Sequence, residues 1–150
     1  MMRRYATCCA LVLAACTAGG VPSSSGAGGG VTIDVSLTQF SQSPTQYGPS
    51  LGYSPAVTTV SVGTQVHFVN VDTFAHTATA ITGATTFPSG FSFGASALQQ
   101  KGTTLSGNWT SGALQPNQSS QTITADKAGT YLYGCFFHYA GGMRAAIVAQ

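Results

Sequence analysis

Charged side chains are scarce in this chain. Of its 150 residues, five are Lys or Arg and three are Asp or Glu, which is 5% in all, whereas a typical soluble domain has about 25%. Five scattered cations cannot form the basic surface that nucleic-acid binding requires. A coiled coil is excluded because it needs many Glu, Lys and Arg residues. Charge-driven disorder is excluded too, because 43% of the residues are hydrophobic.

A helical pattern is also missing. From Val31 onward, no segment of helical length repeats its apolar residues every 3.6 positions. Short β-rich runs occur instead, separated by Gly, Pro and Ser. The strands expected from these runs are 31–37, 57–62, 65–71, 76–81, 121–124, 131–133 and 145–149. About seven short strands predict an all-β fold, an antiparallel Greek-key β-sandwich or barrel.

One long segment, 83–117, contains no recognisable strand. It is rich in Gly, Ser, Thr and aromatic residues, and only 95–100 has the pattern of a helical turn. A stretch of this length without a clear element is either functional or holds structure that the pattern does not reveal.

The N-terminus has the features of an export signal. Arg3 and Arg4 precede an apolar run, 8–16, which is too short for a membrane span of about 20 residues. The run ends in Leu13-Ala14-Ala15-Cys16, which resembles the bacterial lipobox, where a lipidated cysteine becomes the mature N-terminus. We therefore expect a lipoprotein signal peptide at 1–15, acylation of Cys16, and a periplasmic protein anchored to a membrane. An ordinary secretory signal cleaved nearby is the alternative.

Few cysteines remain after such cleavage. Cys8 and Cys9 would leave with the signal, so the mature chain would keep only Cys16 and Cys135. Cys135 then has no disulfide partner, although the compartment is oxidising, and an unpaired thiol in an exported protein needs another role. Residues 16–30 are rich in Gly and Ser and predict a flexible tether, and 31–150 predict one folded domain.

The mature chain is also expected to carry no net charge, in place of the +2 of the full sequence. Its charged side chains are three cations and three anions, Lys101, Lys127 and Arg144 against Asp34, Asp72 and Asp126. No charged face is left to steer a partner, so we expect docking that depends little on salt. With three carboxylates only, we also expect tolerance to acid.

Four residues form a candidate metal site. Cys135, His138 and Met143 are spaced C-x2-H-x4-M, and His76 lies upstream at the start of an expected strand. One thiolate, two imidazoles and a thioether are the ligands of a blue-copper centre, in which Met is the weak axial ligand. Cys135 would follow a strand, and Gly141 and Gly142 would let the loop turn back so that His138 and Met143 face the same ion.

These segments resemble the plastocyanin–azurin family of small cupredoxins. Residues 128–135 resemble the family's last strand before its ligand loop, and 70–76 resemble its first-ligand segment. The resemblance extends over about 31–149 and implies a type 1 copper site with the ligands His76, Cys135, His138 and Met143. Thr77 stands where many members have Asn, which helps to tie the two ligand loops together. Phe137 stands where some members have Pro.

The resemblance further implies an electron carrier and not an enzyme, in which one copper ion cycles between Cu(II) and Cu(I). We expect a monomer that exchanges electrons with a cytochrome or with an oxidase or reductase docking near His138. Phe74, Phe136, Phe137 and Tyr139 are expected to pack, or in part to form an apolar surface around His138.

Other functions use some of the same residue types. A copper-trafficking or copper-sequestering protein could use the same ligands. A Cys–His nucleophile is disfavoured because no orienting Asn or Asp stands out and Met143 would have no role. C-x-x-C-H, the haem-attachment motif, is absent. His67 lies between Val66 and Phe68 in an expected strand, so its side chain should point away from theirs, and we do not expect it to be a ligand. Trp109 is expected to pack in the core or in a loop.

Overall fold

The computed structural model describes residues 30–150. The expected signal peptide at 1–15, the acylation site Cys16 and all of the expected tether except Gly30 lie outside the described residues. In the described part, no helix is both long enough and apolar enough to cross a membrane.

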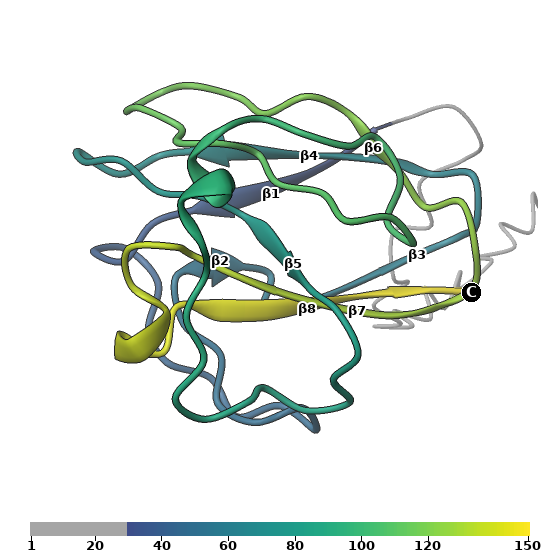
Figure 1. Cartoon of the computed structure of the whole chain (residues 1–150), viewed down its shortest axis with the longest axis horizontal. Helices are drawn as coiled ribbons and strands as arrows, with labels where there is room; N and C mark the ends of the chain where they lie inside the picture. Colours follow the sequence, from purple (N-terminus) through teal and green to yellow (C-terminus); the bar gives the residue numbers. More distant parts are fainter. Residues whose placement is uncertain (1–29) are drawn as a thin grey trace, which may run out of the picture.

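Two four-stranded sheets face each other (Figure 1). The first sheet has the strand order β2-β1-β4-β6, and its strands are β1 (Val31–Val35), β2 (Tyr53–Ser54), β4 (Gln65–Asn70) and β6 (Ile123–Thr124). The second has the order β3-β8-β7-β5, and its strands are β3 (Val57–Val60), β5 (Thr79–Ile81), β7 (Gly129–Gly134) and β8 (Arg144–Ala149). The predicted all-β sandwich is therefore confirmed.

Strand direction differs in part from the expectation. β1 pairs with β4, and β3 with β8, in parallel, while the other four pairs are antiparallel. Alternation of apolar and polar residues sets which face of a strand is buried but not the direction of its neighbour, so the pattern could not reveal the parallel pairs. β2 was not predicted because two residues are too short to alternate, and β5 begins at Thr79, later than expected.

The larger of two buried apolar clusters lies between the sheets. In β4, Val66, Phe68 and Asn70 are fully buried, while the side chains between them face outward. Trp109 stacks on Phe68 with their ring centroids 5.5 Å apart, so it packs in the core as expected. His67 is half-buried, and its Nε2 lies 3.0 Å from the Thr32 hydroxyl. It therefore stands outside the candidate metal site, as its position in the strand predicted.

The segment 83–117 runs along the edge strand β5 and also covers the face of the second sheet that is turned away from the first sheet. It contains the 3₁₀ helix η1 (Ala95–Leu98), which confirms the expected helical turn. The remainder pairs through isolated bridges, such as His76 with Leu114 and Thr79 with Thr110. Phe87, Phe91 and Phe93 pack with Tyr139, which belongs to the second 3₁₀ helix, η2 (Tyr139–Gly141). The segment therefore supports the residues around the candidate site.

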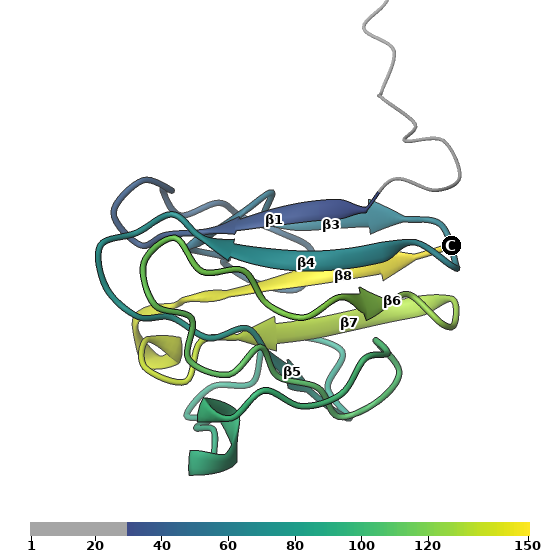
Figure 2. The same ribbon diagram turned by 90° about the horizontal axis from the view of Figure 1, so that it is seen from above.

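Both candidate ligand segments lie at one end of the sandwich. β4 and β7 end at the side of the molecule away from the C-terminus (Figure 2). The loop after β4 carries His76, and the loop after β7 carries Cys135, His138 and Met143. Two segments distant in sequence are thereby brought together.

Candidate metal centre

Cys135 is the first residue after β7, as predicted, and its side chain is fully buried. The loop that follows is closed by backbone hydrogen bonds. The Cys135 N–H donates to the Met143 carbonyl (3.0 Å), and the Tyr139 N–H donates to the Cys135 carbonyl (3.0 Å). Gly142 turns the chain with a φ of +96°, a left-handed conformation that glycine adopts without steric cost. Of the two glycines predicted to allow the tight return, Gly142 is therefore required there, while Gly141 is the last residue of η2 and has no positive φ.

Three of the predicted ligands converge. The ligand atoms of His76, Cys135 and His138 all lie within 4.8 Å of one another. The Cys135 Sγ is 3.8 Å from the Nδ1 of His76 and 3.7 Å from the Nδ1 of His138. A sulfur and two imidazole nitrogens facing one point are the donor set of a type 1 copper site, so the residues present fit a copper ion.

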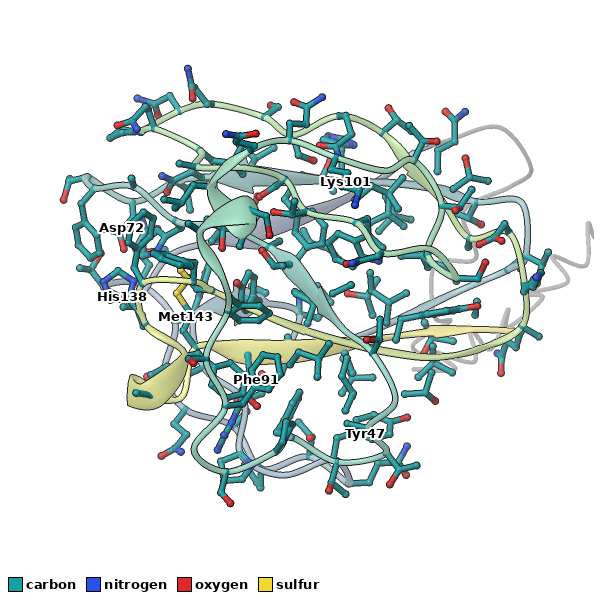
Figure 3. All side chains as sticks on the ribbon, viewed as in Figure 1. Tyr47, Asp72, Phe91, Lys101, His138 and Met143 are labelled. Atoms are coloured by element: carbon teal, nitrogen blue, oxygen red, sulfur yellow. The ribbon has the colours of Figure 1, made fainter. Side chains whose placement is uncertain are left out.

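Met143 closes the same loop. Its N–H donates to the His138 carbonyl at 3.2 Å, and its side chain is fully buried. Figure 3 shows its side chain at the end of the sandwich that also holds His138 and Asp72. This placement is compatible with an axial thioether, and that role remains a prediction.

Burial favours the neutral form of each donor. It raises the pKa of the Cys135 thiol, although hydrogen bonds from the backbone of Thr77, Phe137 and His138 act in the opposite direction. It lowers the pKa of His76 against the effect of the Asp72 carboxylate, and lowers the pKa of His138 together with the charge of His76. Neutral imidazoles keep a lone pair for a metal, and a bound metal would displace the thiol proton.

Asp72 is a functional candidate that the sequence did not single out. Its Oδ2 lies 3.1 Å from the Nε2 of His76, and both side chains are buried. The sequence offered only the segment Asn-x-Asp-x3-His around it, and no strand or helix periodicity places a loop residue against the residue four positions later. Metal-binding histidines usually donate their second ring N–H to such a partner.

Thr77 joins the two ligand segments. Its hydroxyl accepts a hydrogen bond from the Phe136 N–H (2.8 Å), and its own N–H donates to the Cys135 Sγ (3.4 Å). The hydroxyl of Tyr53 donates to the Thr77 carbonyl at 2.5 Å. A threonine therefore ties the loops together at the position where many members of the resembled family have Asn.

Gly52 lies against Met143. A Cβ atom at this position would stand 2.7 Å from the Cγ of Met143 and 3.1 Å from its Cε. The contact comes from the approach of residue 51 to β8, where Leu51 bridges Met143 and Arg144. No sequence signal marks this glycine, because the contact is purely tertiary.

An apolar surface surrounds His138. Phe74 is 38% exposed and Phe137 is 44% exposed, and their ring centroids lie 5.6 Å and 6.0 Å from that of His138. Tyr139, by contrast, is buried, and Phe136 is half-buried. Of the four aromatic residues, two therefore form the surface and the other two contribute more to packing.

Comparison with known proteins yields one family. The family described as copper binding proteins, plastocyanin/azurin family, matches residues 41–150. A search of curated proteins finds no match to the chain.

Solved structures share the fold. A novel purple cupredoxin from Nitrosopumilus maritimus has a TM-score of 0.51 at 19% identity, with 80% of this chain and 99% of that chain covered. An amicyanin mutant in its reduced state has a TM-score of 0.50 at 19% identity, covering 81% of this chain and 83% of its own. Another amicyanin mutant, in its Cu(I) form, has a TM-score of 0.51 at 18% identity with the same coverage.

Proposed function

The chain belongs to the plastocyanin/azurin family of copper-binding proteins, and on that premise we propose that His76, Cys135, His138 and Met143 hold its copper ion. As a member of this family the chain is a cupredoxin, an electron carrier with a copper cofactor and not an enzyme. The observation that carries the ligand assignment is the convergence of one sulfur and two Nδ1 atoms within 4.8 Å.

The residues around the site suit an electron carrier because they hold the ligand side chains in fixed positions. When bound, copper supplies one-electron chemistry between Cu(II) and Cu(I). The Cys135 sulfur is fixed by the Thr77 N–H, and the ligand loop is closed by the bonds between Cys135 and Met143. Ligands that keep their positions in both oxidation states require little rearrangement when an electron arrives or leaves.

The visible spectrum of the copper-loaded protein tests this function. A thiolate bound to Cu(II) at such a site gives an intense blue or purple band that disappears on reduction and returns on oxidation. We expect Cys135→Ser to abolish the band, and His67→Ala, which alters a histidine outside the site, to leave it intact. A colourless protein that retains Cu(I) in air would instead indicate copper storage or trafficking.

Redox partners are proposed to dock over His138. Two observations support this: Phe74 and Phe137 expose an apolar surface beside the His138 ring, and the expected mature chain has balanced charges. The partner would be a cytochrome or an oxidase or reductase that presents an apolar surface. Electron self-exchange between oxidised and reduced copies should depend little on ionic strength. A steep salt dependence would contradict docking through this surface.

Export and anchoring remain proposals as well. The Leu13-Ala14-Ala15-Cys16 sequence supports cleavage before Cys16 and its acylation, which would leave a periplasmic protein bound to a membrane by its lipid chains. Residues 16–30 would then act as the tether of the 31–150 domain. The mass of the mature N-terminal peptide tests the proposal, and an unmodified Cys16 in that peptide would refute it.

A further inference from the structure

Asp72 is a buried carboxylate held entirely by neutral donors. Only 3% of its surface is exposed. Its Oδ2 accepts hydrogen bonds from the N–H groups of Leu37 (2.7 Å) and Thr38 (3.2 Å). Its Oδ1 accepts from the Thr38 hydroxyl (2.8 Å) and from the Thr73 N–H (2.9 Å). No Lys or Arg among the described residues forms an ion pair with it. Hydrogen bonds therefore stabilise its negative charge, but no positive side chain neutralises it.

The same carboxylate determines which nitrogen of His76 carries the proton. The Oδ2 of Asp72 lies 3.1 Å from the His76 Nε2. An ionised carboxylate can only accept hydrogen bonds, so Nε2 is the protonated nitrogen. The lone pair of the neutral ring is then on Nδ1, the atom that faces the Cys135 sulfur at 3.8 Å.

The carboxylate is itself fixed from two sides. Leu37 and Thr38 lie just beyond β1. On the other side, the Asn70 Oδ1 accepts from the Asp72 N–H (2.9 Å), and the Asn70 Nδ2 donates to the carbonyls of Phe74 (2.8 Å) and Leu114 (2.9 Å). Asp72 therefore cannot turn away from His76 without breaking several buried hydrogen bonds.

From this arrangement we propose that Asp72 is a positioning residue that presents the His76 Nδ1 to copper and sets the preference of the site for Cu(II) over Cu(I). A fixed negative charge in a poorly screened environment stabilises the more positive oxidation state. The inference rests on the proposed ligand role of His76, and it adds a charged residue outside the ligand set that lowers the reduction potential.

Asp72→Asn tests the charge because it keeps the shape of the side chain. We expect the Cu(II) affinity to fall about 10–100-fold and the Cu(I) affinity to fall less, so that the reduction potential rises. Each tenfold excess of the Cu(II) loss over the Cu(I) loss corresponds to about 59 mV. Voltammetry of the copper-loaded protein and competition with chelators for each oxidation state measure these quantities.

Two variants separate charge from structure. Asp126→Asn removes an equal charge at the turn before β7, the end of that strand opposite Cys135, and should leave the potential unchanged. Thr38→Val removes one hydrogen bond to Asp72 without changing its charge. It should lower the free energy of unfolding but shift the reduction potential much less than Asp72→Asn does. If Asp72→Asn destabilises the protein but has the same reduction potential as the wild type, Asp72 has a structural role only and the proposal is wrong.

The wild-type protein provides a test that does not depend on a variant folding. In the metal-free protein, ¹⁵N NMR of the imidazoles should show the neutral His76 ring protonated at Nε2, because there only Asp72 and no metal selects the nitrogen. Protonation at Nδ1 would overturn the proposal. The proposed function has a separate readout, because its failure would appear as the absence of the Cys135-dependent visible band in the wild type.

Discussion

Thr77 shows how much a single residue contributes to this site. Its hydroxyl, N–H and carbonyl each take part in a hydrogen bond, to Phe136, Cys135 and Tyr53 respectively. The first two bonds cross from the loop after β4 to the loop after β7. Because the residue is fully buried, water cannot replace a bond that is lost.

Thr77→Val is therefore expected to destabilise the metal-free protein. Valine keeps the shape but removes the hydroxyl, so the Phe136 N–H loses its acceptor at a cost of about 1–3 kcal/mol. Urea denaturation measures the change. Thr77→Ser should recover most of the loss, and Thr59→Val, at an exposed position of β3, serves as the control. An unchanged free energy of unfolding in Thr77→Val would show that the hydroxyl does not tie the loops.

At the scale of elements, the ligand loop is set by what packs against it. Tyr139 donates from its hydroxyl to the Pro88 carbonyl (3.0 Å), and its ring lies under the Arg144 guanidinium, 5.5 Å from the centroid. From the other side, Gly52 lies directly against Met143. The loop is thus held between the segment before β2 and the long 83–117 segment.

Gly52→Ala should disturb Met143 selectively. The new Cβ would overlap Met143 at 2.7 Å, and the φ of +78° at this position adds backbone strain. We expect a shift of the visible and EPR spectra of the copper-loaded protein, with a loss of about 1–3 kcal/mol of stability.

The control for this variant is Gly63→Ala. Gly63 also has a positive φ, +91°, but no atom lies within 4 Å of the position that a Cβ would take there. This variant should lose stability through backbone strain and leave the spectra unchanged. Identical spectra in Gly52→Ala and the wild type would mean that Met143 does not respond to this contact.

For the whole molecule, the small number of charged side chains limits how much folding stability a fall in pH can remove. Hydrogen bonds overcome the effect of burial and hold the pKa of Asp72 well below its usual value, while the hydroxyl and N–H of Ser106 lower the pKa of Asp126. The pKa values of His76 and His138 are lowered by burial. In all four cases the unfolded chain binds a proton more readily than the folded chain.

The metal-free protein should therefore lose stability with falling pH in two steps. The first begins near pH 6.5, the ordinary pKa of the histidines, and the second begins near pH 3.8, that of the aspartates. Above both values the stabilisation is fully present. Denaturation measured from pH 8 to about pH 3 checks this. With so few titrating groups we expect the fold to persist, and its collapse between about pH 5 and pH 3 would contradict the predicted acid tolerance.

The amino-acid sequence alone determined the sandwich and the candidate ligands. Short β-rich runs marked seven of the eight strands because every strand buries at least one face, and β7 and β8 bury both. Cys135, His138 and Met143 were found because a single loop after one strand carries all three, so their spacing along the chain already limits their distance in space.

Only the tertiary structure decided the surroundings of those ligands. The parallel pairs, the hydrogen bonds from Leu37 and Thr38 that fix the Asp72 carboxylate, the bonds of Thr77 and the close approach of Gly52 to Met143 join segments from different strands or loops. Such contacts depend on how the two sheets and their loops come together. Local periodicity and spacing contain no information about that arrangement, because they act only between residues that are near one another in the chain.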